Sequence, residues 1–225
     1  MTRDLREILG AIFDCDGVFV DSTATSPDRF CMAAERMGLV ITPRVMAEKA
    51  IIPRMGKDAI SYFWPEADAD AVYAEWERVD DEYPFVPIPG TRETLEELRA
   101  MHLISSALSN RGMRTLSPLL RKIGVAHLMN FVWGCEGFVV KPNPDSALVV
   151  LKFYERLNIR PSQLLFVGDS VESDWPVARD NGMRFLAVLT GVSSDREFRE
   201  AGVPARNIVC SITEVPEWIR QNDPR

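Results

Sequence analysis

Acidic residues cluster at two points of the sequence where short apolar runs end. Asp14 and Asp16 lie two residues apart directly after the run of residues 8–13, and Asp169 follows the run of residues 164–167. Carboxylates brought close together repel one another unless a cation lies between them, and a set of oxygen ligands suits Mg²⁺. A Mg²⁺ ion held by few protein oxygens keeps positions for water and phosphate. The pattern therefore predicts a magnesium site that handles a phosphate.

Other polar residues also follow apolar runs. Ser109 and Asn110 come after the run of residues 103–108, and Asp174 lies five residues beyond Asp169. Ligands bind at the carboxyl ends of the strands in an open α/β sheet, so these side chains are candidates for the same site. Each also has a purely structural interpretation, because Ser109 suits a turn at a strand end and Asp174 suits a helix cap.

The elements that must position these residues alternate along the chain. Short apolar runs predict buried strands, and apolar residues at helical spacing between the runs predict helices. The expected strands are residues 8–13, 103–108, 131–133, 164–167, 185–189 and 208–210. This alternation is typical of a doubly wound parallel α/β sheet.

Residues 22–86 interrupt the alternation, since their apolar positions follow helical spacing only. The proline-rich segment Pro84–Gly90 ends this stretch, because proline cannot continue a helix. We therefore expect two domains. One is an α/β core of residues 1–21 and 87–225, and the other is a helical insert of residues 22–86.

Composition limits the partners of the chain. Its 225 residues carry 26 Lys and Arg against 33 Asp and Glu, for a formal net charge of −7. This acidity argues against nucleic acid polymers and anionic membranes as partners. Four widely spaced cysteines and the lack of a signal peptide or membrane span favour reduced thiols in a cytoplasmic protein. No pattern indicates an oligomeric state.

Four short segments occur in order along the chain, each at an expected strand end. They are Phe13–Ser22 (FDCDGVFVDS), Leu108–Arg111 (LSNR), Lys141–Asp145 (KPNPD) and Val167–Asp174 (VGDSVESD). Together they resemble the ordered motifs of the haloacid dehalogenase superfamily, and the insert resembles the C1 cap of its phosphoglycolate phosphatase and β-phosphoglucomutase-like branch. The resemblance covers nearly the whole chain. It implies a Rossmann-like α/β core with an inserted helical cap domain.

The resemblance implies a role for each acidic residue. Asp14 would be the nucleophile that forms an aspartyl-phosphate, and Asp16 would be the general acid and base. The metal ligands would be Asp14, the backbone carbonyl of Asp16, and Asp169. Asp174 would act from behind the ligands by orienting a lysine or a metal-bound water, although Glu172 is an alternative for that position. An acid at position 16 also favours phosphoester chemistry over dehalogenation.

The resemblance implies a set of phosphate contacts as well. Lys141 would place a positive charge on the phosphoryl oxygens and on Asp14. Ser109 would donate its hydroxyl to the phosphate with help from Asn110, and Gly17 would lie against the same group.

Two basic residues of the insert are candidates for substrate recognition. Arg54 and Lys57 flank Gly56, which permits a close approach of the backbone, and either cation could meet an anionic leaving group. Surface charges at a helix entry would give the same pattern.

These observations predict an enzyme, a Mg²⁺-dependent phosphatase that acts on a small phosphate ester such as a sugar phosphate, phosphoglycolate or a nucleotide. A β-phosphoglucomutase-like enzyme would use the same residues and return the phosphoryl group to a sugar. A non-catalytic phosphate-accepting or interaction module is the third alternative, although every motif position is occupied here.

Overall fold

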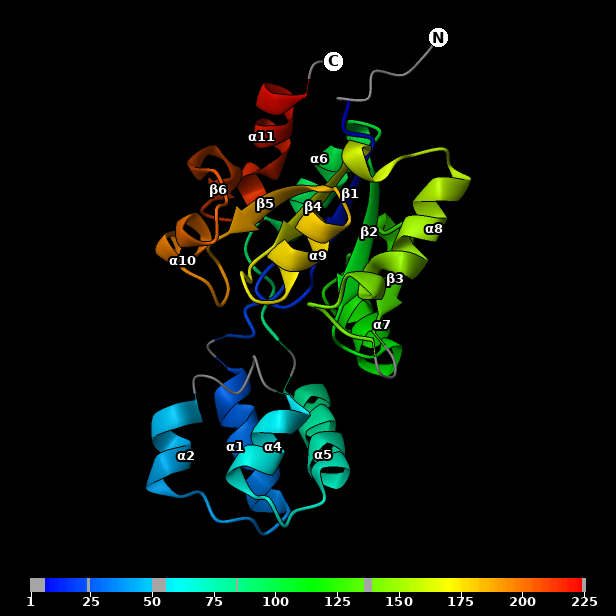
Figure 1. Ribbon diagram of the computed structural model, residues 1–225. Helices are drawn as coiled ribbons and strands as arrows, with labels where there is room; N and C mark the ends of the chain where they lie inside the picture. Colours follow the sequence, from blue (N-terminus) through cyan, green and yellow to red (C-terminus); the bar gives the residue numbers. More distant parts are fainter. Residues whose placement is uncertain (1–6, 24, 50–55, 84, 136–138, 224–225) are drawn as a thin grey trace. The chain divides into compact units, whose positions relative to one another are not determined.

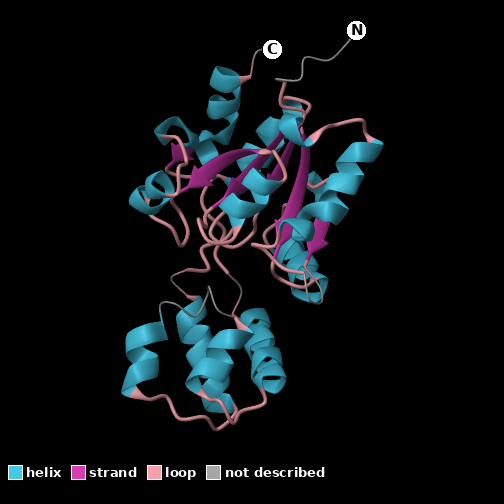
Figure 2. Cartoon of the chain, in the orientation of Figure 1, coloured by secondary structure: helices cyan, strands magenta, loops and turns pink. Residues whose placement is uncertain are grey.

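The computed structural model describes residues 7–23, 25–49, 56–83, 85–135 and 139–223. The chain divides into two compact units. Unit 1 comprises Met1–Val20 and Pro87–Arg225, and unit 2 comprises Asp21–Val86. The sheet belongs to unit 1, whereas the regular structure described in unit 2 is helical (Figure 2).

Unit 1 contains a six-stranded sheet in which every pair of neighbouring strands is parallel. The strands are β1 (Gly10–Phe13), β2 (Ile104–Ser109), β3 (Phe131–Gly134), β4 (Leu164–Gly168), β5 (Arg184–Val188) and β6 (Ile208–Val209). Their order across the sheet is β3-β2-β1-β4-β5-β6. Each predicted strand overlaps one of these strands, so the predicted doubly wound parallel α/β fold is confirmed.

Helices cover both faces of the sheet (Figure 1). They are α6 (Thr91–Ala100), α7 (Met113–Lys122), α8 (Leu148–Arg156), α9 (Asp174–Asp180), α10 (Asp195–Glu200) and α11 (Val215–Asn222), with short 3₁₀ turns at Ala126–Leu128, Pro144–Ala147, Pro161–Gln163, Ala205–Asn207 and Ile212–Glu214. All residues of β1 and β4 are buried. Burial on both faces explains why these strands read as continuous apolar runs rather than as alternating ones.

Unit 2 has its own apolar core. Its helices are α1 (Ser26–Arg36), α2 (Pro43–Glu48), α4 (Lys57–Phe63) and α5 (Ala69–Glu82). Phe30 of α1 and Trp76 of α5 pack edge to face with ring centroids 5.1 Å apart. Val72 and Val79 of α5 lie in the same buried cluster. The helical spacing seen in this part of the sequence therefore corresponds to one buried face on each of α1 and α5.

Two properties expected from composition can be compared with the structure. All four cysteines are free thiols. In the part of the chain that the structure describes, no helix is both long enough and apolar enough to cross a membrane.

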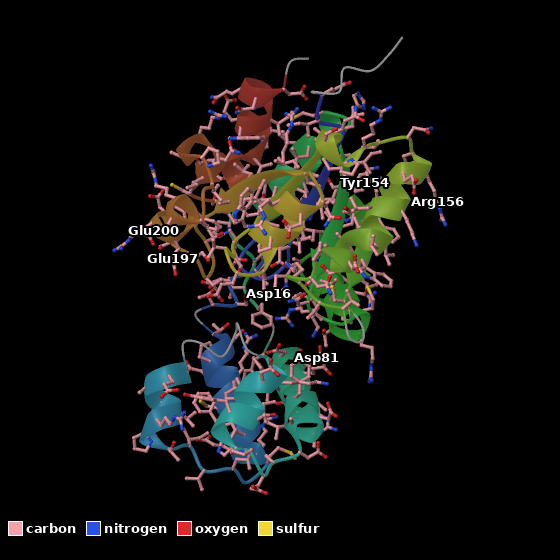
Figure 3. All side chains as sticks on the ribbon, in the orientation of Figure 1. Asp16, Asp81, Tyr154, Arg156, Glu197 and Glu200 are labelled. Atoms are coloured by element: carbon pink, nitrogen blue, oxygen red, sulfur yellow. The ribbon has the colours of Figure 1, made fainter. Side chains whose placement is uncertain are left out.

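Tyr154 joins α8 to the middle of the sheet. Its side chain is fully buried on the sheet side of the helix, whereas Arg156 is exposed on the outer side (Figure 3). The hydroxyl lies 3.0 Å from the Ala11 carbonyl oxygen, 2.8 Å from the Ile104 carbonyl oxygen and 3.0 Å from Ser106 Oγ. Burial raises the pKa of Tyr154 above its ordinary value, so the hydroxyl remains a donor.

We expect Tyr154→Phe to lower the free energy of unfolding by about 1–2 kcal/mol, because it leaves buried carbonyl and hydroxyl partners without this hydrogen bond. Urea unfolding followed by circular dichroism measures the change. Tyr83→Phe is the matched control, since that side chain is 48% exposed. Equal stability of the two variants would contradict the prediction.

Candidate active site

The residues singled out in the sequence gather at the carboxyl ends of the parallel strands. Asp14 follows β1, Ser109 ends β2, and Asp169 follows β4. Lys141 reaches the same edge from the segment between β3 and α8. Asp16 lies at this edge of unit 1 as well (Figure 3).

A buried ammonium group stands at the centre of the cluster. Lys141 Nζ lies 2.8 Å from Asp14 Oδ1 and 2.6 Å from Asp174 Oδ1. Only 1% of the Lys141 side chain is exposed. Burial alone would lower the pKa of Lys141, but the Asp14 and Asp174 carboxylates raise it above its ordinary value. Lys141 is therefore a permanent positive charge at this site.

Asn110 fixes the backbone that carries this lysine. The Asn110 amide nitrogen donates to the Lys141 carbonyl at 3.0 Å, and its oxygen accepts the Lys141 N–H at 2.8 Å. The Asn110 side chain is thus committed to the backbone of Lys141. The phosphate contact expected of Asn110 remains a prediction, as does that of Ser109, whose Oγ accepts the Arg111 N–H at 3.1 Å.

Asp174 begins helix α9 and has no exposed surface. Its Oδ2 accepts the backbone N–H groups of Asp169 at 3.0 Å and Ser170 at 3.1 Å, while Oδ1 faces Lys141. Both oxygens are therefore engaged within the protein. Glu172, the alternative weighed for this position, is exposed at the surface.

Three carboxylates form a compact acidic group. Ligand atoms of Asp14, Asp169 and Asp174 lie within 4.8 Å of one another. Burial, together with the charges of Asp174 and Asp16, raises the pKa of Asp14 to about 7 despite the opposing effect of Lys141. Burial and the charges of Asp174 and Asp14 likewise raise the pKa of Asp169. The negative charges of this group therefore exceed the positive charge of Lys141, which favours the binding of a cation.

The donor set fits Mg²⁺. Among the described residues, no hydrogen bond ends on Asp14 Oδ2 or Asp169 Oδ1. Two carboxylates with one such oxygen each, in a cluster whose charges favour a cation, match the hard oxygen ligands that Mg²⁺ prefers. Asp174 has no comparable oxygen and supports the ligands instead by holding Lys141 and the Asp169 backbone.

The loop after β5 clamps Asp169, a feature that the sequence analysis missed. The Val192 N–H donates to Asp169 Oδ2 at 2.8 Å, and the Ser193 N–H donates to the Asp169 carbonyl at 3.1 Å. A Cβ on Gly191 would collide with the Asp169 side chain. The loop acts through backbone groups and the absence of a side chain at Gly191, so its residue types did not indicate this role. Its position directly after a strand of the same sheet could have indicated it.

Gly17 lies on the other side of the same carboxylate. Its φ is +73°, and a Cβ there would collide with Asp169 and with Gly191. Thr190 Oγ1 donates to the Gly17 carbonyl at 2.6 Å. Only glycine combines this backbone conformation with so close an approach. The phosphate contact expected of Gly17 remains a prediction.

Asp16 has a partner that the sequence analysis did not single out. Its carboxylate accepts two hydrogen bonds from the Arg111 guanidinium, at 2.7 Å from Nε and 2.8 Å from Nη2. The two residues are 95 positions apart in the sequence, so only the fold brings them together.

Lys57 and Arg54 are the two candidates for substrate recognition in the insert. Lys57 Nζ lies 2.7 Å from Asp70 Oδ1, and the lysine side chain is 53% exposed. This arrangement is that of a solvated surface pair. Arg54 lies outside the described residues. Substrate recognition by either residue remains a prediction.

The sequence matches the family model for haloacid dehalogenase-like hydrolases over residues 11–188. The chain therefore belongs to the haloacid dehalogenase-like hydrolase family. A phosphoglycolate phosphatase from Chromobacterium violaceum is 30% identical over 84% of this chain and 88% of its own length. One from Escherichia coli is 28% identical over 83% of each chain. The predicted superfamily and enzyme class, a phosphatase, are confirmed.

Solved structures share the fold. A Bacteroides fragilis protein described as a haloacid dehalogenase-like hydrolase aligns with a TM-score of 0.76, at 24% identity over 93% of this chain and all of that chain. A Thermotoga maritima protein described as a β-phosphoglucomutase aligns with a TM-score of 0.70, at 22% identity over 95% of this chain and 99% of that one. At such identities the likeness concerns architecture alone.

Acid titration of the cluster predicts a pH-dependent response to metal. Because the pKa of Asp14 is raised from 3.8 to about 7, the folded metal-free protein binds more protons than the unfolded chain between these values. This contribution to stability is present below about pH 4 and is lost as the pH rises through about 7. Mg²⁺ competes with the same protons. We expect Mg²⁺ to raise Tm more near pH 8 than near pH 5, and equal shifts would contradict this.

Gly191→Ala tests the clamp on Asp169. The added methyl group would collide with the Asp169 side chain and displace it, so we expect Mg²⁺ affinity to fall by roughly 10–100-fold. Titration calorimetry with MgCl₂ measures the affinity directly. Val192→Ala is the control, because it keeps the N–H that holds Asp169. Equal Mg²⁺ affinity in the two variants would show that the clamp has no part in metal binding.

Proposed function

We propose that this phosphatase hydrolyses small phosphate monoesters with Mg²⁺, through an aspartyl-phosphate on Asp14. The observation that carries the proposal is the buried cluster in which Lys141 lies between Asp14 and Asp174 beside Asp169. A phosphate dianion approaches a carboxylate only where positive charge offsets their repulsion, and Lys141 supplies part of that charge.

In the first step, the Asp14 oxygen that does not hold the metal attacks phosphorus and the bond from phosphorus to the ester oxygen breaks. Asp16 donates a proton to the departing oxygen, which leaves as the alcohol. Ser109 donates its hydroxyl to a phosphoryl oxygen. Lys141 stays charged throughout, because its two carboxylate partners hold its pKa high.

In the second step, a water molecule attacks the phosphorus of the aspartyl-phosphate and gives a proton to Asp16. Inorganic phosphate leaves and the Asp14 carboxylate is restored. An acyl phosphate suits this step, since its carboxylate is a good leaving group. Asp16 thus returns to the protonated form that the next turnover requires.

Asp14 and Asp169 would hold Mg²⁺ through the oxygens that face away from Lys141 and Val192, with the backbone carbonyl of Asp16 as a third ligand. The ion would neutralise charge on the phosphoryl oxygens. Asp174 would keep Asp169 in place through its backbone N–H.

The names of the relatives suggest a first substrate to try. Several curated relatives are phosphoglycolate phosphatases. We therefore propose 2-phosphoglycolate as the leading candidate within the wider class of small phosphorylated metabolites, ahead of sugar phosphates and nucleotides.

Asp14→Asn tests the nucleophile. We expect hydrolysis of p-nitrophenyl phosphate with Mg²⁺ to fall by roughly four orders of magnitude or more, because the amide oxygen cannot form the aspartyl-phosphate. EDTA should abolish the wild-type activity and Mg²⁺ should restore it. Acid quench and mass spectrometry should find phosphate on the wild-type peptide that contains Asp14. Asp180→Asn, in which an exposed carboxylate is changed, is the control.

Unchanged turnover in Asp14→Asn would refute the assignment of the nucleophile. Activity that persists in EDTA would refute the metal requirement. Conversion of β-glucose 1-phosphate to glucose 6-phosphate without release of phosphate would favour the mutase alternative.

A further inference from the structure

Arg111 forms a bidentate ion pair with Asp16, the proposed acid and base of the reaction. Its Nε and Nη2 donate to the two carboxylate oxygens of Asp16. The Arg111 side chain is 15% exposed and that of Asp16 is 33% exposed. The pair is therefore partly shielded from water and partly accessible.

The backbone of Arg111 is fixed by the segment that carries the phosphate contacts. Its N–H donates to Ser109 Oγ at 3.1 Å, and a Cβ on Gly134, at the end of β3, would collide with its carbonyl oxygen. The preceding residue, Asn110, is clamped to Lys141. These contacts hold the backbone from which the Arg111 guanidinium extends to Asp16.

This ion pair restricts the proposed role of Asp16 as the proton donor to the ester oxygen. Both of its oxygens accept hydrogen bonds from Arg111, whereas protonation of the ester oxygen requires one of them to face the substrate. Each oxygen keeps a further lone pair, but the bidentate contact fixes the direction in which it points, so opening one hydrogen bond of the pair lets Asp16 turn to the ester oxygen. A guanidinium in a partly buried place gives up a carboxylate most readily when another carboxylate takes its position, since the fork geometry and the charge are then both satisfied.

Lys141 cannot provide that second anion site. Its ammonium group is shared between Asp14 and Asp174, and 1% of its side chain is exposed. Arg111 lies instead beside Asp16, the residue that would contact the leaving oxygen. A carboxylate a bond or two from that oxygen would fall within reach of the guanidinium.

We propose that Arg111 is a specificity-determining residue, which binds a carboxylate on the leaving alcohol and thereby releases Asp16 to the ester oxygen. The inference rests on the proposed function and adds to it the residue that recognises the carboxylate in phosphate esters of short hydroxy acids, such as 2-phosphoglycolate. No covalent bond changes in this step, because one carboxylate replaces another on the same guanidinium. Esters without such a group leave Asp16 paired and react slowly.

The test compares two esters that differ in one charge, 2-phosphoglycolate and its neutral carboxamide. We expect wild-type kcat/KM to favour the acid by about 10–100-fold, the range for a hydrogen-bonded charge pair. Arg111→Met should reduce this preference to within a few fold, by lowering kcat/KM for the acid and by raising it for the amide, for which Asp16 is no longer paired. Arg111→Lys, which keeps the charge without the fork, should give an intermediate ratio.

Two controls separate specificity from general damage. Arg114→Met removes an exposed arginine of the neighbouring helix and should keep the wild-type preference. For Arg111→Met, an unfolding temperature close to that of the wild-type enzyme shows that the variant is folded.

Some results would overturn the inference. One is an unchanged preference in Arg111→Met; another is a wild-type enzyme that turns over p-nitrophenyl phosphate but does not discriminate between the acid and the amide. The wild-type ratio needs no variant, so the inference can fail even if Arg111→Met does not fold. Absence of turnover with all three esters would refute the proposed function itself, and this inference with it.

Discussion

The contact of one buried ammonium with two buried carboxylates organises this edge of the sheet. Lys141 lies between Asp14 and Asp174, and almost none of its side chain reaches water. Removing either carboxylate would leave a buried charge short of a partner, an arrangement that costs several kcal/mol. The segment after β3, the end of β1 and the start of α9 are therefore held at fixed positions relative to one another.

The rest of the site is built to keep that contact in place. Asn110 ties the lysine backbone to the end of β2, and Asp174 accepts the first N–H groups after β4. The loop after β5 closes on Asp169 through Val192. The segments after β2, β4 and β5 thus each hold a side chain or backbone group of the site by hydrogen bonds, so the sheet positions side chains that lie beyond its strands.

Much of this arrangement could be predicted from the sequence because its signals are local. Strands buried on both faces leave continuous apolar runs, and the residues that follow each run, such as Asp14 and Asp169, meet at one edge. The residue types of Arg111 and of the loop at Gly191 gave no such signal, although the loop also follows a strand. The first depends on a partner 95 residues away, and the second acts through its backbone and the absence of a side chain. Such features can be recognised only from the three-dimensional structure.

The same geometry explains how an acidic chain can handle an anion. Three carboxylates, Asp14, Asp169 and Asp174, face one lysine, which leaves an excess of two negative charges, the charge of one divalent cation. The net charge of −7 belongs to the whole chain and does not describe this edge. With Mg²⁺ in the proposed position, the cluster is neutral before a phosphate arrives. A second anionic group then needs its own cation, and Arg111 can serve it by exchanging the Asp16 carboxylate for that of the substrate.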